Sequence, residues 1–161
     1  GLLDDVFERH HLSDDFSLYL HRPTATDPTM APPGHDAFYV LSPVPHLDAD
    51  VDWVVTAEAY RARVAAYLEA TVLPGLQASL ATSRVLTPRE FELDYLAYKG
   101  AAFSLEPRLT QSAYFRPHNR SEDVDGLYFV GAGTHPGAGI PGVLSTARVL
   151  DTVVPDPMAR G

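Results

Sequence analysis

Hydrophobic and polar residues alternate in two short stretches near the start of the chain, and this pattern predicts strands. Residues 16–22 alternate and are rich in strand formers. Residues 36–43 carry a continuous apolar run, which favours a strand in the centre of a sheet. Three prolines between Thr24 and Gly34 predict that the two strands are joined by an irregular crossover.

The middle of the chain has a helical period instead. A helix is predicted from Thr56 to Leu73, with Thr56 as its N-cap and Pro74-Gly75 as its stop. Its hydrophobic stripe consists of Tyr60, Val64, Tyr67, Leu68 and Val72. Residues 80–86 predict a short strand, and Thr87-Pro88 predicts a helix that runs to about Leu96.

The last third of the chain is rich in turns. Residues 98–119 show little periodicity and predict loop and short strand, and Asp125-Gly126 predicts a turn. A short buried strand is expected over 127–130, followed by glycines and a helix from about Gly142 to Val153. The whole pattern predicts an α+β fold that ends in one β-loop-α unit.

Composition excludes several classes of protein and site. The 161 residues are 45% hydrophobic, enough for a core, and no apolar run reaches the roughly 18 residues of a membrane span. The net charge is -9 and there is no basic stripe, so we expect no nucleic-acid partner. Without cysteine the chain has no disulfide, thiolate site or Cys nucleophile. The histidines lack metal-ligand spacing, so no metal is predicted, and neither Ser112 nor Ser145 lies in a nucleophile elbow.

Five glycines fall within residues 131–142, directly after the last predicted strand. Residues 137–142 formally match the dinucleotide pattern G-x-G-x-x-G. However, the match begins six residues after Val130 and contains Pro141, which argues against a self-contained Rossmann site. Glycines still let a backbone approach a ligand closely, and the N-terminus of the following helix favours negative charge. We therefore interpret this segment as facing a ligand.

Residues 126–143, followed by Ser145, resemble the C-terminal signature of the bacterial-type phytoene desaturases, which are FAD-dependent carotenoid desaturases. Further segments resemble the same family in the same order, at residues 18–24, 26–28, 31–32, 38–41, 43–46, 102–107 and 110–119. The resemblance spans nearly the whole chain but only the C-terminal third of the family. It implies that this chain is a fragment and that its partner is a missing N-terminal half, whose glycine-rich βαβ holds the ADP part of FAD. The isolated chain is then expected to be inactive.

The resemblance also implies a fold and a division of the chain. Residues 1–110 are expected to form part of a substrate-binding lobe, with a mixed or antiparallel sheet and helices. Residues 111–161 are expected to be the return segment that completes the Rossmann-like FAD domain with a closing β-loop-α element.

The implied activity is the removal of hydrogen across CH2–CH2 bonds of a C40 carotene, from phytoene toward lycopene, with FAD as the hydride acceptor. Because this substrate dissolves in lipid, a cytoplasmic location with peripheral contact to a membrane surface is expected. The resemblance implies that nine residues bind the cofactor. Those near the pyrophosphate and ribityl chain are Gly131, Gly133, Thr134 and His135. Those near the flavin ring are Gly139, Ile140, Gly142 and Val143, and Gly137 lies between the two groups.

The neutral substrate needs an apolar channel, for which the candidate lining residues are Phe38, Tyr39, Leu41, Phe103, Tyr114 and Phe115. The catalytic residue is not identified. Arg116 and His118 are candidates either for stabilising charge on a polyene cation or for joining the loop to the sheet. Two other functions stay open: a related flavin oxidoreductase of retinol saturase or amine oxidase type, and a cofactor-free lipid-binding module.

Overall fold

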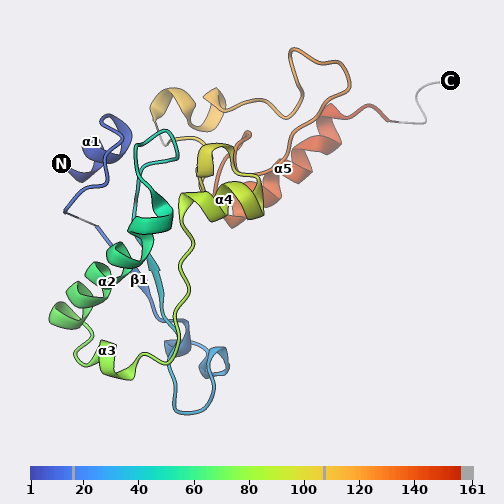
Figure 1. The fold of residues 1–161 in the computed structure, drawn as a ribbon. Coiled ribbons are helices and arrows are strands. Elements are labelled where there is room, and N and C mark those ends of the chain that lie inside the picture. Colours follow the sequence, from blue (N-terminus) through green and yellow to red (C-terminus); the bar gives the residue numbers. More distant parts are fainter. Residues whose placement is uncertain (16, 107, 157–161) are drawn as a thin grey trace. The chain divides into compact units, whose positions relative to one another are not determined.

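The computed structural model of the chain describes residues 1–15, 17–106 and 108–156 (Figure 1). The chain divides into two compact units, Gly1–Gly100 and Ala101–Gly161. The sequence-based division between residues 110 and 111 concerns function, and it stays a prediction.

The first unit contains a small antiparallel sheet. Strand β1 (Tyr19–His21) pairs with β2 (Tyr39–Leu41), so that Leu20 lies opposite Val40. Both strands lie within the predicted stretches, and two 3-10 helices, η1 (Pro23–Ala25) and η2 (Pro28–Met30), confirm the irregular crossover. The prediction of a central strand is wrong for the part of the chain described, because this sheet has only two strands.

Asp36 ties the crossover to the start of β2. Its Oδ1 accepts hydrogen bonds from the Thr24 hydroxyl at 2.7 Å and from Arg22 Nε at 2.9 Å. The bond from Thr24, and secondly the bond from Arg22, lower the pKa of the Asp36 carboxyl below its ordinary value. The carboxylate therefore remains charged, and holds the crossover, into more acidic solution than an unpaired aspartate would.

Helix α2 (Trp53–Thr71) supplies most of the core of the first unit. It begins before the predicted Thr56 because Asp52 is its N-cap: Oδ1 of Asp52 accepts a hydrogen bond from the Val54 N–H at 2.9 Å. Trp53, Tyr60 and Leu68 are buried. The predicted stripe is thus confirmed at Tyr60 and Leu68 but not at Tyr67 and Val72, which are exposed.

The segment after α2 differs from the prediction. A short helix α3 (Leu76–Ser79) is followed by residues 80–86 without regular structure, so the predicted strand is wrong. An apolar, β-branched run becomes a strand only where another strand offers hydrogen bonds, and here no described strand does.

Helix α4 (Pro88–Tyr95) confirms its prediction and starts with a capping box. Thr87 Oγ1 accepts the Arg89 N–H at 3.2 Å, while Glu90 Oε2 accepts the Thr87 N–H at 2.8 Å. The hydrogen bond from Thr87 lowers the pKa of Glu90. The unit is completed by α1 (Leu2–Phe7) near the N-terminus and by the 3-10 helix η3 (Tyr98–Gly100) after α4.

The second unit consists of short 3-10 helices, loops and one long helix. η4 (Leu109–Gln111) and η5 (Ala113–Phe115) are followed by a hairpin-like loop closed by an isolated antiparallel bridge between Arg120 and Tyr128. The predicted strand over 127–130 is reduced to this bridge and is wrong as a strand.

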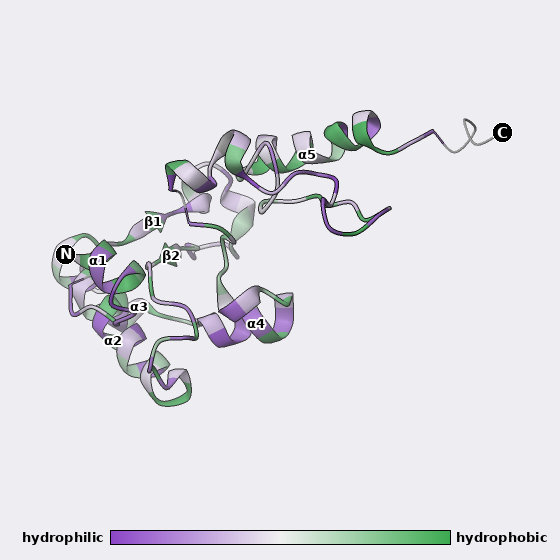
Figure 2. Ribbon diagram, turned by 90° about the horizontal axis from the view of Figure 1, so that it is seen from above, coloured by the Kyte–Doolittle hydropathy of each residue, from purple (hydrophilic) through white to green (hydrophobic). Residues whose placement is uncertain are grey.

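Helix α5 (Ile140–Val153) closes the second unit and begins slightly before the predicted Gly142, because Pro141 is compatible with a first helical turn. Hydrophobic residues, green in Figure 2, recur along it. In the described parts of the chain, no helix has the length and apolar character needed to cross a membrane.

Candidate functional site

The glycine loop, residues 131–142, leads into α5 and is fastened to that helix by Thr146. This threonine is fully buried. Its Oγ1 accepts a hydrogen bond from the Gly131 N–H at 2.9 Å and donates one to the Val143 carbonyl at 2.7 Å. Thr134, also buried, donates through its hydroxyl and its N–H to the Gly131 carbonyl. The start of the loop is therefore fixed relative to the first turns of α5.

Replacing Thr146 with valine is expected to loosen this attachment. Valine has nearly the same shape but cannot accept the Gly131 N–H, and an unsatisfied buried donor costs about 1–3 kcal/mol. We expect the Gly131 amide to exchange its hydrogen faster in Thr146→Val, measured by hydrogen exchange. Thr152 is a matched control, since its hydroxyl makes the same bond to a carbonyl three residues back (Val149, 2.7 Å) but is exposed. Equal exchange of Gly131 in wild type and Thr146→Val would contradict this role.

Three glycines of the loop lie close to other parts of the second unit. A Cβ on Gly142 would lie 2.6 Å from the Gly137 carbonyl oxygen. A Cβ on Gly133 would lie 2.8 Å from Ser104 Oγ, and a Cβ on Gly137 would lie 3.3 Å from Arg116 Nε. These close approaches let the loop fold back on itself and on its neighbours, so these glycines have a structural reason to be there that requires no ligand.

The other two glycines, Gly131 and Gly139, border open space. A Cβ on either would meet no described atom within 4 Å, although both residues have a positive φ (115° and 83°). Gly139 is the N-cap of α5, and Ile140 beside it is 79% exposed. The loop thus presents bare backbone next to a helix N-terminus, an arrangement that suits a flat ligand carrying negative charge.

The nine residues predicted to bind the cofactor all lie in this loop and in the first turn of α5. Besides Gly131 and Val143, which bond to Thr146, two of them have hydrogen bonds within the protein: Thr134 through its hydroxyl, as above, and His135 through its N–H, which donates to the Pro117 carbonyl at 3.0 Å. The His135–Pro136 peptide bond is cis. Their individual roles toward a cofactor stay predictions.

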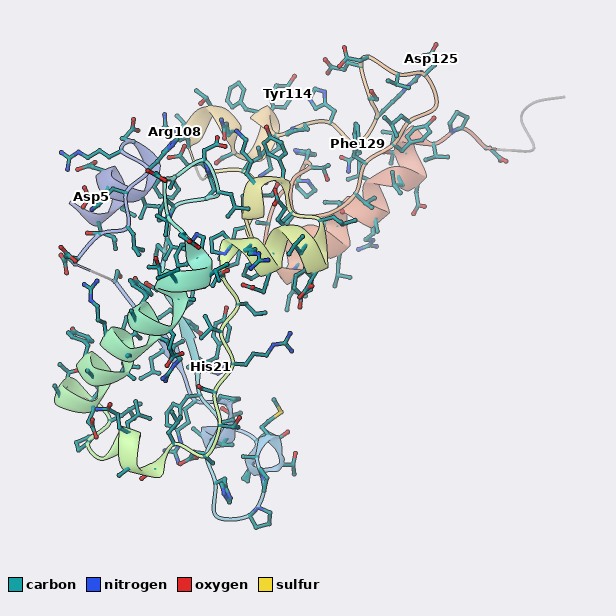
Figure 3. All side chains as sticks on the ribbon, viewed as in Figure 1. Asp5, His21, Arg108, Tyr114, Asp125 and Phe129 are labelled. Atoms are coloured by element: carbon teal, nitrogen blue, oxygen red, sulfur yellow. The ribbon has the colours of Figure 1, made fainter. Side chains whose placement is uncertain are left out.

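A cavity of about 470 Å³ lies in the second unit, between η5 and the hairpin-like loop. Figure 3 labels two residues of its lining, Tyr114 and Phe129. Both catalytic candidates also line it, but they differ in environment. Arg116 is buried and its Nη1 donates to the Ala132 carbonyl, whereas His118 is exposed and its Nδ1 lies 2.7 Å from Glu122 Oε1. Arg116 is therefore attached to the glycine loop, and His118 to the hairpin-like loop.

A second cavity, of about 350 Å³, lies in the first unit between β2 and α2. Strand side chains alternate between two faces, and the residues of this region that line the cavity follow that period of two: Phe38, Val40, Ser42 and Val44. Of the channel candidates Phe38, Tyr39 and Leu41, Phe38 lines this cavity. Tyr39 lies on the other face, where its ring is 6.4 Å from that of Tyr19.

The predicted channel residues are divided between the two units. Phe103, Tyr114 and Phe115 belong to the second unit, where all three are largely exposed. Only Tyr114 and Phe115 among them line its cavity. The assignment of these residues to a substrate channel stays a prediction.

Comparison with known proteins confirms the resemblance found in the sequence. The chain is 54% identical over 156 residues to the neurosporene-forming phytoene desaturase of Rhodobacter capsulatus, covering 96% of this chain and 30% of that protein. It is 55% identical over 154 residues to the lycopene-forming phytoene desaturase of Pseudescherichia vulneris, covering 95% and 31%. A 4,4'-diapophytoene desaturase of Methylomonas sp is 40% identical over 146 residues, covering 90% and 29%. The chain spans about a third of the length of the curated relatives it matches.

A family match covers most of the chain. The sequence model described as flavin containing amine oxidoreductase matches residues 11–149, which include the sheet, the glycine loop and most of α5. The open backbone at Gly131 and Gly139 lies within this match. The chain belongs to the flavin-containing amine oxidoreductase family.

Proposed function

We propose that this chain is part of an FAD-dependent phytoene desaturase in carotenoid biosynthesis, and that it supplies the glycine loop against which the flavin rests. The observation that carries this proposal is the bare backbone at Gly131 and Gly139 beside the N-terminus of α5. It is supported by more than 50% identity to phytoene desaturases over nearly the whole chain.

The cofactor, when bound, would accept one hydrogen of a CH2–CH2 bond as a hydride, which carries the two electrons, and a second hydrogen would leave the substrate as a proton as the double bond forms. The role of this chain is to hold and orient the cofactor. The glycine loop gives the flat ring close access to the backbone, and α5 directs its positive end toward negative charge that develops there.

The substrate class proposed is a carotene, because the named relatives are phytoene desaturases and a neutral hydrocarbon requires apolar walls more than charged groups. The β2–α2 cavity offers such walls on Phe38, Val40 and Val44. The substrate dissolves in lipid, so we also propose peripheral contact with a membrane from the cytoplasmic side. The remaining two thirds of the relatives' length is proposed to supply the part of the flavin site that the chain lacks.

The test is a chimeric enzyme. The matching 31% of the Pseudescherichia vulneris desaturase is replaced by this chain, purified, and incubated with phytoene. We expect a chimera that retains FAD and converts phytoene into coloured carotenes, identified by product analysis. The unmodified Pseudescherichia enzyme is the positive control.

Two results would overturn the proposal. A chimera that retains FAD but leaves phytoene unchanged would point to a related flavin oxidoreductase acting on another substrate. A folded chimera without the visible absorption of a flavin, which nevertheless binds carotene, would point to a cofactor-free lipid-binding module.

A further inference from the structure

The glycine loop lies against the side chain of Arg116 at two positions, Ala132 and Gly137. Nη1 of Arg116 donates a hydrogen bond to the Ala132 carbonyl, and Nε lies 3.3 Å from the position of a Cβ on Gly137. The next residue, Pro117, accepts the His135 N–H. Contacts at Ala132, His135 and Gly137 therefore hold the middle of the loop on residues 116–117. Arg116 is a positioning residue for the loop, whatever ligand the loop binds.

Arg116 has no acidic partner in direct contact among the described residues, although Glu122 and Asp123 line the same cavity. The side chain is 8% exposed, and arginine remains protonated in proteins. Its hydrogen bond to Ala132 goes to a neutral carbonyl, and in the described residues no carboxylate forms an ion pair with it. Two acidic side chains of the same unit are engaged elsewhere, Glu106 with Arg108 and Glu122 with His118.

A buried charge is costly unless an opposite charge accompanies it. By contrast, Arg9 and Arg22 are exposed and have acidic partners, Asp5 and Asp36. Arg116 combines deep burial with an uncharged partner. It also lines the 470 Å³ cavity of its unit, so its environment has access to a ligand.

We propose that Arg116 carries the positive charge that balances an anionic group of the bound flavin cofactor. This rests on the proposed function, which places the cofactor against the loop that Arg116 holds. The cofactor offers two sources of negative charge, the pyrophosphate and the reduced flavin ring. Both are delocalised anions that a guanidinium pairs with well.

The experiment compares three variants in the FAD-loaded chimera: Arg116→Gln, Arg116→Lys and Arg120→Gln. Arg120 is a matched control because it lines the same cavity but is exposed. FAD affinity is measured by quenching of flavin fluorescence, ADP affinity by competition, and the midpoint potential by spectroelectrochemistry. We expect Arg116→Gln either to weaken FAD and ADP binding about tenfold or more, or to lower the potential of the bound flavin. Arg116→Lys should keep most of the wild-type affinity and potential, because it keeps the charge. Arg120→Gln should change the FAD and ADP affinities by no more than about twofold and leave the potential unchanged.

The two sources of anion give different results. Parallel losses of FAD and ADP affinity identify the pyrophosphate, and a lowered potential with unchanged ADP affinity identifies the reduced ring. If Arg116→Gln does not fold, the result for Arg116→Lys decides. An affinity and a potential near those of the wild type support the role of the positive charge. A folded Arg116→Lys variant with weakened FAD binding and a lowered potential overturns the inference.

Failure of this inference is distinguishable from failure of the proposed function. A wild-type chimera that binds no FAD overturns the proposed function and this inference with it. A wild-type chimera that binds FAD, together with an Arg116→Gln variant that loses thermal stability but keeps its affinities and potential, overturns this inference alone.

Discussion

Replacing Gly139 with leucine is expected to abolish flavin retention in the chimeric enzyme. A Cβ at this position points into space that holds no described atom within 4 Å, directly before the first turn of α5. That space is where we place the cofactor, so a leucine side chain would occupy the volume of the ligand rather than that of the protein. The measurement is the amount of flavin released per protein after denaturation, read from its visible absorption.

Backbone strain has to be separated from the blocking of the ligand. Gly139 has φ 83° and ψ 153°, a conformation almost confined to glycine, and any side chain there costs about 1–3 kcal/mol. Gly139→Ala carries the same strain with a smaller side chain, so it is expected to retain much more flavin than Gly139→Leu. Gly126→Leu, also at positive φ (76°) and in open space, should retain the wild-type amount. A Gly139→Leu enzyme with full flavin content would refute the placement of the cofactor.

The glycine-rich candidate loop could be found in the sequence, but the packing of its individual glycines could not. Five glycines in twelve residues indicated a ligand-facing loop, because a simple turn needs fewer. Which of them border open space depends on contacts that sequence spacing does not show. Gly137 lies against Arg116 and Gly142 against Gly137, whereas Gly131 and Gly139 are open. Only the folded loop separates these two groups.

The burial of Arg116 could not be predicted from the sequence either. Arginine is normally exposed, and the carbonyl that it binds belongs to Ala132, sixteen residues later in the chain. Such a contact arises from the path of the intervening hairpin-like loop. The pair Arg116 and His118 looked alike as polar residues beside aromatic ones, and the structure gives them different environments.

Helices were predicted better than strands for a physical reason. The start of α4 is encoded locally, by Thr87, Pro88 and Glu90, and these residues form the capping box at that end. A strand depends on a partner from elsewhere in the chain. Residues 80–86 have a strand-like composition but no described strand beside them, and several line the β2–α2 cavity instead. The start of α2 was placed too late because Asp52, not Thr56, provides the cap.

Replacing Gly100 with alanine is expected to destabilise the first unit severely. Gly100 is buried at the end of η3 with φ 69°, and an added Cβ would lie 2.1 Å from the Pro88 carbonyl oxygen and 2.6 Å from its carbonyl carbon. These are backbone atoms in the first turn of α4, so relief requires the helix itself to move. Left-handed strain alone costs about 1–2 kcal/mol, and with the clash we expect a loss of about 4 kcal/mol or more.

Gly34→Ala separates the clash from the strain. Gly34 has φ 78° in the same unit, but a Cβ there meets nothing within 4 Å, so this variant should lose only the strain energy of about 1–2 kcal/mol. Urea unfolding of the chain can be followed by the fluorescence of Trp53, its single tryptophan, which is buried in α2. Gly100→Ala should unfold at much lower urea than Gly34→Ala, or already be unfolded in buffer, because domains have only about 5–15 kcal/mol of stability. Equal midpoints for the two variants would mean that α4 yields to the added methyl group, and that the contact between Gly100 and Pro88 does not fix the start of that helix.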